Sequence, residues 1–139
     1  MANNGAAIIE EIQKRSAVAS ESELYRDIAG ALPAAERAQF ATAAALTPTD
    51  LLAIGREFYT KRLRPQVYDI ICGKLKYCDN RHVYDSAAEI VGLVANGVGE
   101  ALASAYGIPS AVGGSGGKLV VAVSAAVLKE GLNNFCGCV

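Results

Sequence analysis

The chain has 139 residues, of which 52% are hydrophobic and 19% are charged, and its formal net charge is −1. This is the length of one ordinary domain, and it is sufficient to bury a core without help from metals or disulfides. The composition excludes a disordered chain, and the near-neutral charge gives no general argument for nucleic-acid binding.

The N-terminal part of the sequence predicts four amphipathic helices. Ser20 and Glu23 have the spacing of a capping box, in which each residue caps the other's backbone at a helix start. Pro33 fits the first turn of a third helix, and Thr47 followed by Pro48 marks the start of a fourth. The apolar spacing places the helices at residues 6–19, 20–32, 33–46 and 48–63.

The middle of the chain predicts one further helix, at residues 65–78. Arg64 precedes Pro65, and a residue before proline is pushed away from helical torsion angles, so we expect a break there. Asp79 and Asn80 are expected to end the helix. Cys78 therefore comes at its last turn.

The C-terminal part predicts two apolar helices joined by a glycine-rich loop. Ser86 and Glu89 form a second capping box, and Gly107 is a typical helix stop. The stretch 118–131 has strand-like valines followed by helix formers. Because no second strand-like run exists to pair with it, we expect a helix.

Together these elements predict an all-α, single-domain helical bundle of about six to seven helices. Its expected parts are amphipathic helices at 1–80, an apolar hairpin at 84–131 and a short tail at 132–139. In the tail we expect Phe135 to anchor, Cys136 to lie beside it and Cys138 to lie near solvent.

The apolar hairpin is the first candidate surface. A helix that is apolar nearly all round is buried by other helices, by a partner or by lipid. We expect the amphipathic helices to wrap the hairpin, with an oligomer interface or membrane insertion as the alternative. The residues concerned are Val91, Val94, Val98, Leu102, Val120, Val123 and Val127.

A locally basic stretch is the second candidate surface, because cations can contact an anion or a protein partner. Such a run usually forms a solvated face, and its tyrosines have helical spacing, so nucleic-acid binding is not expected. The cations are Arg56, Lys61, Arg62, Arg64, Lys74, Lys76 and Arg81.

The cysteines and the single histidine are weak candidates for a metal site, because they lack the spacing of a zinc knuckle. We expect core or surface thiols, with a disulfide or a metal site as alternatives, and no cofactor. The sequence leaves open whether the middle cysteines reach the C-terminal pair. The residues are Cys72, Cys78, His82, Cys136 and Cys138.

Catalysis has little support in this sequence. Cys78 and His82 form a conceivable nucleophile–base pair, but the histidine sits in an expected turn. The glycine-rich stretch at 113–118 departs from the phosphate-loop pattern, because Val112 and Leu119 replace its first glycine and its final Ser or Thr. The last four residues match a prenylation box poorly. No catalytic residue and no small-molecule substrate are inferred.

These observations favour a small helical protein–protein interaction or assembly module without catalytic activity. It would act through the hairpin or through the basic stretch at 56–81, with a protein partner or by self-association. The alternative is a membrane-active, toxin-like or immunity-like helical protein that inserts its glycine-rich hairpin. Because we find neither a signal peptide nor a clear transmembrane span, we expect a cytoplasmic protein with reduced thiols.

Overall fold

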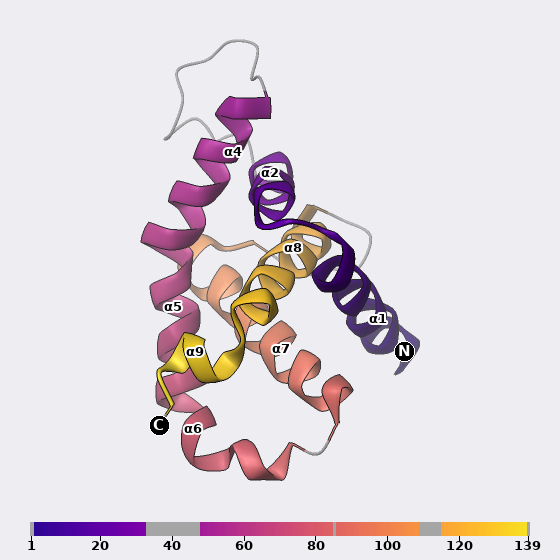
Figure 1. Ribbon diagram of the computed structural model, residues 1–139, viewed down its shortest axis with the longest axis vertical. Coiled ribbons are helices and arrows are strands. Elements are labelled where there is room, and N and C mark those ends of the chain that lie inside the picture. The colour runs from indigo at the N-terminus through magenta and orange to yellow at the C-terminus, as the bar shows by residue number, and fades with distance from the viewer. Residues whose placement is uncertain (1, 33–47, 85, 109–114, 139) are drawn as a thin grey trace.

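The computed structural model describes residues 2–32, 48–84, 86–108 and 115–138. Within these ranges every regular element is a helix and none is a strand, so the predicted all-α fold is confirmed. The predicted helix at 33–46 lies outside the described residues. The helices are α1 (Ala2–Val18), α2 (Glu21–Ala31), α4 (Pro48–Glu57), α5 (Arg64–Tyr68), α6 (Tyr77–Asn80), α7 (Ala87–Tyr106), α8 (Ser115–Glu130) and α9 (Leu132–Cys136), as Figure 1 shows.

Helix α8 is the centre of the bundle. It packs against α1, α2 and α7 and leads directly into α9 (Figure 1). Nearly all of its side chains from Leu119 to Val127 are buried, including the hydroxyl-bearing Ser124. In this arrangement α7 and α8 contact each other, and α1 and α2 cover α8.

The helix boundaries follow local signals in the sequence. The Ser20 hydroxyl accepts a hydrogen bond from the Glu23 backbone N–H at 3.1 Å, and the Glu23 carboxylate accepts one from the Ser20 backbone N–H at 3.0 Å. Ser86 caps α7 by accepting from the Glu89 backbone N–H at 3.2 Å. Gly107 ends α7 at a φ of 64°, in the left-handed region that glycine adopts without strain.

The expected break at Arg64–Pro65 is wrong. The chain stays helical from Pro48 to Lys74, through π-helical turns at Phe58–Leu63 and Asp69–Lys74. In the first of these turns the Arg64 backbone N–H donates to the carbonyl of Tyr59, five residues back. A π turn widens the helix where proline would disturb the regular α-helical ladder.

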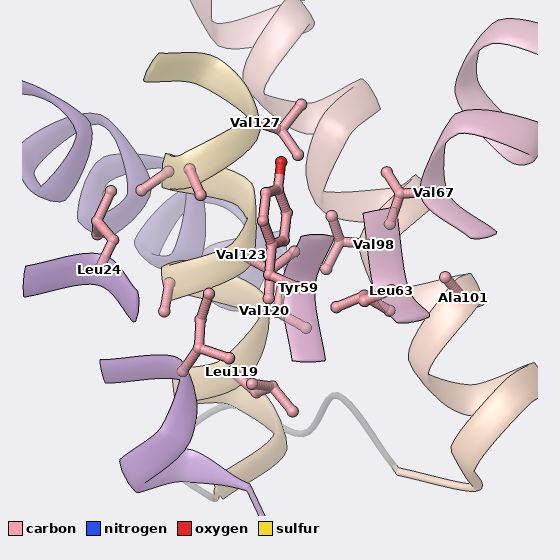
Figure 2. Packing of buried hydrophobic residues seen from close by; sticks show 14 of the residues in the cluster. Leu24, Tyr59, Leu63, Val67, Val98, Ala101, Leu119, Val120, Val123 and Val127 are labelled. Atoms are coloured by element: carbon pink, nitrogen blue, oxygen red, sulfur yellow. The ribbon is translucent and has the colours of Figure 1, made fainter. Parts of the chain in front are cut away.

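Buried residues on one face keep the helical segment continuous on both sides of Pro65. Phe58, Leu63, Val67 and Ile71 are all fully buried, at spacings of five, four and four residues. The five-residue step spans the first π turn, so the same face points at the core on both sides of Pro65. Figure 2 shows Leu63 and Val67 from this segment together with Val98 of α7 and Val123 of α8.

Two glycines allow the helices to approach closely. A Cβ atom added to Gly55 of α4 would lie 1.7 Å from the backbone oxygen of Tyr25 in α2. A Cβ added to Gly97 of α7 would lie 2.7 Å from the Ile71 side chain. Real Cβ atoms do not approach other atoms this closely, so both contacts depend on the missing side chain.

Candidate functional site

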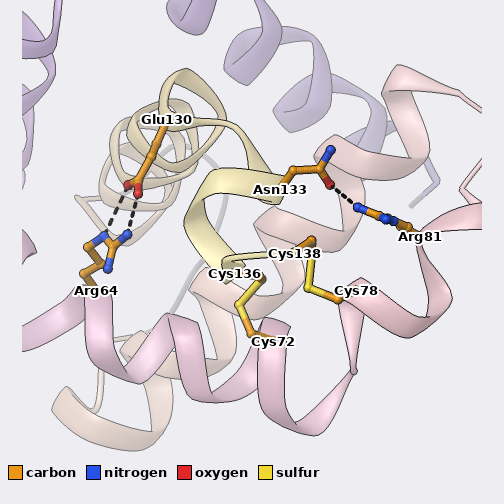
Figure 3. The surroundings of a disulfide bond; sticks show 8 residues. All are labelled: Arg64, Cys72, Cys78, Arg81, Glu130, Asn133, Cys136 and Cys138. Atoms are coloured by element: carbon orange, nitrogen blue, oxygen red, sulfur yellow. Dashed lines mark hydrogen bonds and ion pairs between the residues drawn. A yellow bond between two sulfur atoms is a disulfide. The ribbon is translucent and has the colours of Figure 1, made fainter.

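Two disulfides join the C-terminal tail to the middle of the chain. Cys72 pairs with Cys136 and Cys78 pairs with Cys138, across 64 and 60 residues, and Figure 3 shows the bridges side by side. The expectation of free thiols is therefore wrong. We call the joined residues 72–78 and 136–138 the C-terminal clasp.

The tail folds back as predicted. Phe135 and Cys136 are buried, and Cys138 is partly exposed. The Phe135 ring lies 6.0 Å from the ring of Tyr68, and the Arg64 guanidinium carbon lies 4.6 Å from the Phe135 ring centre. A cation over an aromatic face is attracted to it, so the ring and the charge hold α9 in place beside the two bridges.

Polar contacts also join helices beside the C-terminal clasp. Arg64 donates two hydrogen bonds to the Glu130 carboxylate, one of them from Nε to Oε1 at 3.2 Å (Figure 3). Arg81 Nη1 donates to Asn133 Oδ1 at 3.3 Å. Burial raises the pKa of the nearby Tyr59 hydroxyl well above its usual range, so this phenol stays neutral.

The weak metal and catalytic candidates do not form a site. The four cysteines are bound to one another, whereas a metal ligand or a nucleophile requires a thiolate. His82 is exposed in a short 3₁₀ turn, η3 (Arg81–Val83), and Cys78 lies in a different helix. Among the described residues no group of three or more His, Cys, Asp or Glu side chains is arranged to hold a metal ion.

The candidate hairpin surface lies inside the bundle. All seven residues predicted for an interface or a membrane hairpin are at most 4% exposed. They are core residues in this conformation and offer no surface to a partner. None of the described helices is both long and apolar enough to cross a membrane.

The candidate basic residues divide into two groups. Three have partners in other helices: Arg64 binds Glu130, Lys74 Nζ lies 2.6 Å from Glu100, and Arg81 binds Asn133. The remaining four, Arg56, Lys61, Arg62 and Lys76, are exposed, as Lys74 and Arg81 also are, and Lys61 Nζ lies 3.6 Å from Glu57 Oε1 one helical turn away.

A cleft at the opposite end of the bundle was not predicted. It lies between α1, α2 and α8 and has a volume of about 610 Å³. Its apolar lining comes from Ile8, Ala31, Val121 and Ala122, with Gly30 and Gly117 between them. No single segment of the sequence signals it, because its lining comes from three separate helices.

Charged side chains also line this cleft. Arg15 Nη2 lies 2.5 Å from the Asp27 carboxylate, which ties α1 to α2. Arg26, Lys118 and Glu11 are the other charged residues of the lining within the part of the chain that the structure describes. Three cations and two carboxylates therefore leave a formal excess of one positive charge.

Comparison of the chain with protein-family models, with curated proteins and with solved structures finds no significant match.

Proposed function

We propose that this chain is a helical protein–protein interaction module that binds an acidic partner through the exposed side of residues 51–76. We call this side the basic arm. One observation carries the proposal: of the two candidate surfaces, the apolar hairpin is buried and part of the basic set is exposed.

The charge of the arm suits an acidic protein surface. Residues 51–76 contain six basic and two acidic residues, whereas the whole chain has a net charge of −1. Tyr68 is 40% exposed among these cations and supplies an apolar contact of the kind enriched in interfaces. Complementary charges steer encounter and set orientation, and their effect weakens with salt.

The two disulfides favour an oxidising compartment as the place where the module acts. Disulfides persist in secreted, periplasmic and cell-surface proteins and are rare where glutathione keeps thiols reduced. The expected cytoplasmic location implied reduced thiols, so the bridges argue against it. Alkylation of the native protein before and after reduction measures the number of free thiols and tests this inference.

The membrane-active alternative requires the core to open. Its hairpin would have to leave α1 and α2, which cover α8, and expose residues that are now buried. Leakage of anionic liposomes on addition of the intact, oxidised protein would favour this alternative over the interaction module.

The test of the basic arm compares two variants of equal charge change. Arg56→Glu/Lys61→Glu reverses two exposed cations of the arm, and Lys14→Glu/Lys129→Glu reverses two exposed cations elsewhere. We expect a partner captured from the source by the wild type to be retained by the second variant. The first variant should bind it about tenfold or more weakly, which corresponds to about 1.4 kcal/mol.

Salt dependence provides a second measurement on the same complex. The wild-type affinity should fall as ionic strength rises, and the arm variant should show a weaker dependence. A partner that binds the arm variant as tightly as the wild type would contradict the proposal. So would a self-associated form of the chain that forms equally well with both variants.

A further inference from the structure

We propose that the cleft between α1, α2 and α8 binds a single-chain amphiphile with one carboxylate head group, a ligand of the fatty-acid type. This site is separate from the basic arm, and it adds a small-molecule ligand to an interaction module. Its volume of about 610 Å³ falls within the range of roughly 300–1,000 Å³ that is usual for small-molecule sites.

The cleft has room for an apolar chain because small residues line it. Gly30 of α2 shows this most directly, because a Cβ added there would meet no atom within 4 Å. Val121 and Ala122 of α8 and Ile8 of α1 supply apolar walls around the space. An alkyl chain in this space leaves water for an apolar surface, which contributes about 0.8 kcal/mol for each methylene group buried.

The charged lining fits one negative head group. Arg15 and Asp27 neutralise each other within their ion pair, which leaves two cations and the carboxylate of Glu11 among the described lining residues. Arg26 is half-buried and Lys118 is exposed at the first turns of α8. A singly charged carboxylate balances the excess positive charge, and an ammonium head group would add to it.

The experiment measures the binding of dodecanoate and of dodecyltrimethylammonium to the intact oxidised protein by isothermal titration calorimetry, below their micelle concentrations. We expect one saturable site for dodecanoate and at least tenfold weaker binding of the cation. Arg26→Gln/Lys118→Gln should lower the affinity for dodecanoate about tenfold or more, as the loss of charged hydrogen bonds implies.

A matched pair of glycine variants tests the place of binding. Gly30→Phe should fill the cleft and abolish dodecanoate binding, whereas Gly73→Phe should leave it unchanged. Both glycines are exposed in helical segments, and a Cβ at either position meets nothing within 4 Å, so neither substitution disturbs packing at its Cβ.

Two results would overturn the proposal: no saturable binding of dodecanoate to the wild type, or binding to Gly30→Phe with unchanged affinity. Equal affinity for the anionic and cationic amphiphiles would show that the charged lining does not select the ligand, and it would likewise contradict the proposal. None of these results depends on the basic arm, because Arg56 and Lys61 remain intact in every variant.

Discussion

The two ends of this bundle are stabilised in different ways. At the clasp end, α6 has four residues and α9 has five, and two disulfides fix them. At the cleft end, α1 has 17 residues and α2 has 11, and packing, a capping box and an exposed ion pair hold them. Helices of one turn are not stable alone in water, and longer ones gain their stability from an apolar face.

The two ends therefore differ in what their contacts do: one set holds short helices in place, and the other leaves a cleft between long helices. Covalent bridges keep the short helices in place and close the surface over Phe135. The noncovalent end keeps an open cleft between α1, α2 and α8, lined in part by small residues. One end of the bundle is therefore closed by covalent bonds, and the other holds the cleft that we propose as a ligand site.

The largest effect is expected from removal of both bridges. In the loop-entropy model a first bridge across about 60 residues contributes about 4 kcal/mol, and a second closes a ring of roughly ten residues and contributes about 2.5 kcal/mol. Each single bridge deletion, Cys72→Ala/Cys136→Ala or Cys78→Ala/Cys138→Ala, should therefore cost about 2.5 kcal/mol, and the quadruple variant about 6.5 kcal/mol.

Urea denaturation measures these costs. Since small domains have a total stability of about 5–15 kcal/mol, the quadruple variant should be largely unfolded or close to it. The quadruple variant is expected to lose more stability than the two single deletions together. If the two single losses instead add up to the quadruple loss, each bridge closes its own loop independently, and the shared-loop explanation is wrong.

A smaller loss of stability is expected from Gly55→Ala. The added methyl group would collide with the Tyr25 backbone, where no side-chain rotation can relieve the contact, so we expect a loss of about 3 kcal/mol. Gly30→Ala in α2 is the control, because its methyl group meets no atom within 4 Å. That control should stabilise the protein by about 0.5–1 kcal/mol, since alanine is the better helix former. Equal effects of the two substitutions, measured by thermal melting, would contradict the packing of α4 on α2.

A moderate effect is expected at the start of α2. Ser20→Ala removes the hydroxyl that accepts from the Glu23 backbone N–H and should cost about 1 kcal/mol. Ser16→Ala is the control, because the Ser16 hydroxyl donates only to a carbonyl within its own helix α1. Amide exchange should accelerate in the first turn of α2 and stay unchanged at the clasp. Uniform acceleration across both ends would argue against separate local stabilities.

The smallest effect is a dependence on pH at the same cap. The hydrogen bond from the Ser20 backbone N–H lowers the pKa of the Glu23 carboxyl below the usual value of a glutamate. A carboxylate whose pKa is lower in the folded state contributes stability above the unfolded pKa and loses it as pH falls through the folded pKa.

Glu23→Gln provides the comparison for this pH effect, because the amide keeps a hydrogen-bond acceptor without the charge. The melting temperature of the wild type should exceed that of Glu23→Gln at pH 7, and the difference should shrink towards pH 3. A difference that is constant over this range would contradict the assignment.

The local parts of the fold were predictable from the sequence. Ser20, Ser86 and Gly107 act within one helical turn, so their spacing alone defined where α2 and α7 begin or end. The burial of Phe135 followed in the same way, because it is a large apolar residue in the short tail after the last long helix.

The long-range parts were not predictable from local patterns. The pairing of Cys72 with Cys136 depends on how the π turn at Asp69–Lys74 and α9 pack, across 64 residues of sequence. The helix continues through Pro65 because buried residues on both sides outweigh the local preference for a break. The cleft arises where three separate helices meet, so no single segment indicates it.

The contrast between a covalently closed end and an open end depends on the two bridges, and disulfide mapping of the unreduced protein tests it most directly. Cleavage after Lys74 and Lys76 separates Cys72 from Cys78, and fragmentation at Gly137 separates Cys136 from Cys138. We predict that mass spectra of the linked peptides contain Cys72–Cys136 and Cys78–Cys138. Free thiols in the native protein, or pairing of Cys72 with Cys78, would contradict the account.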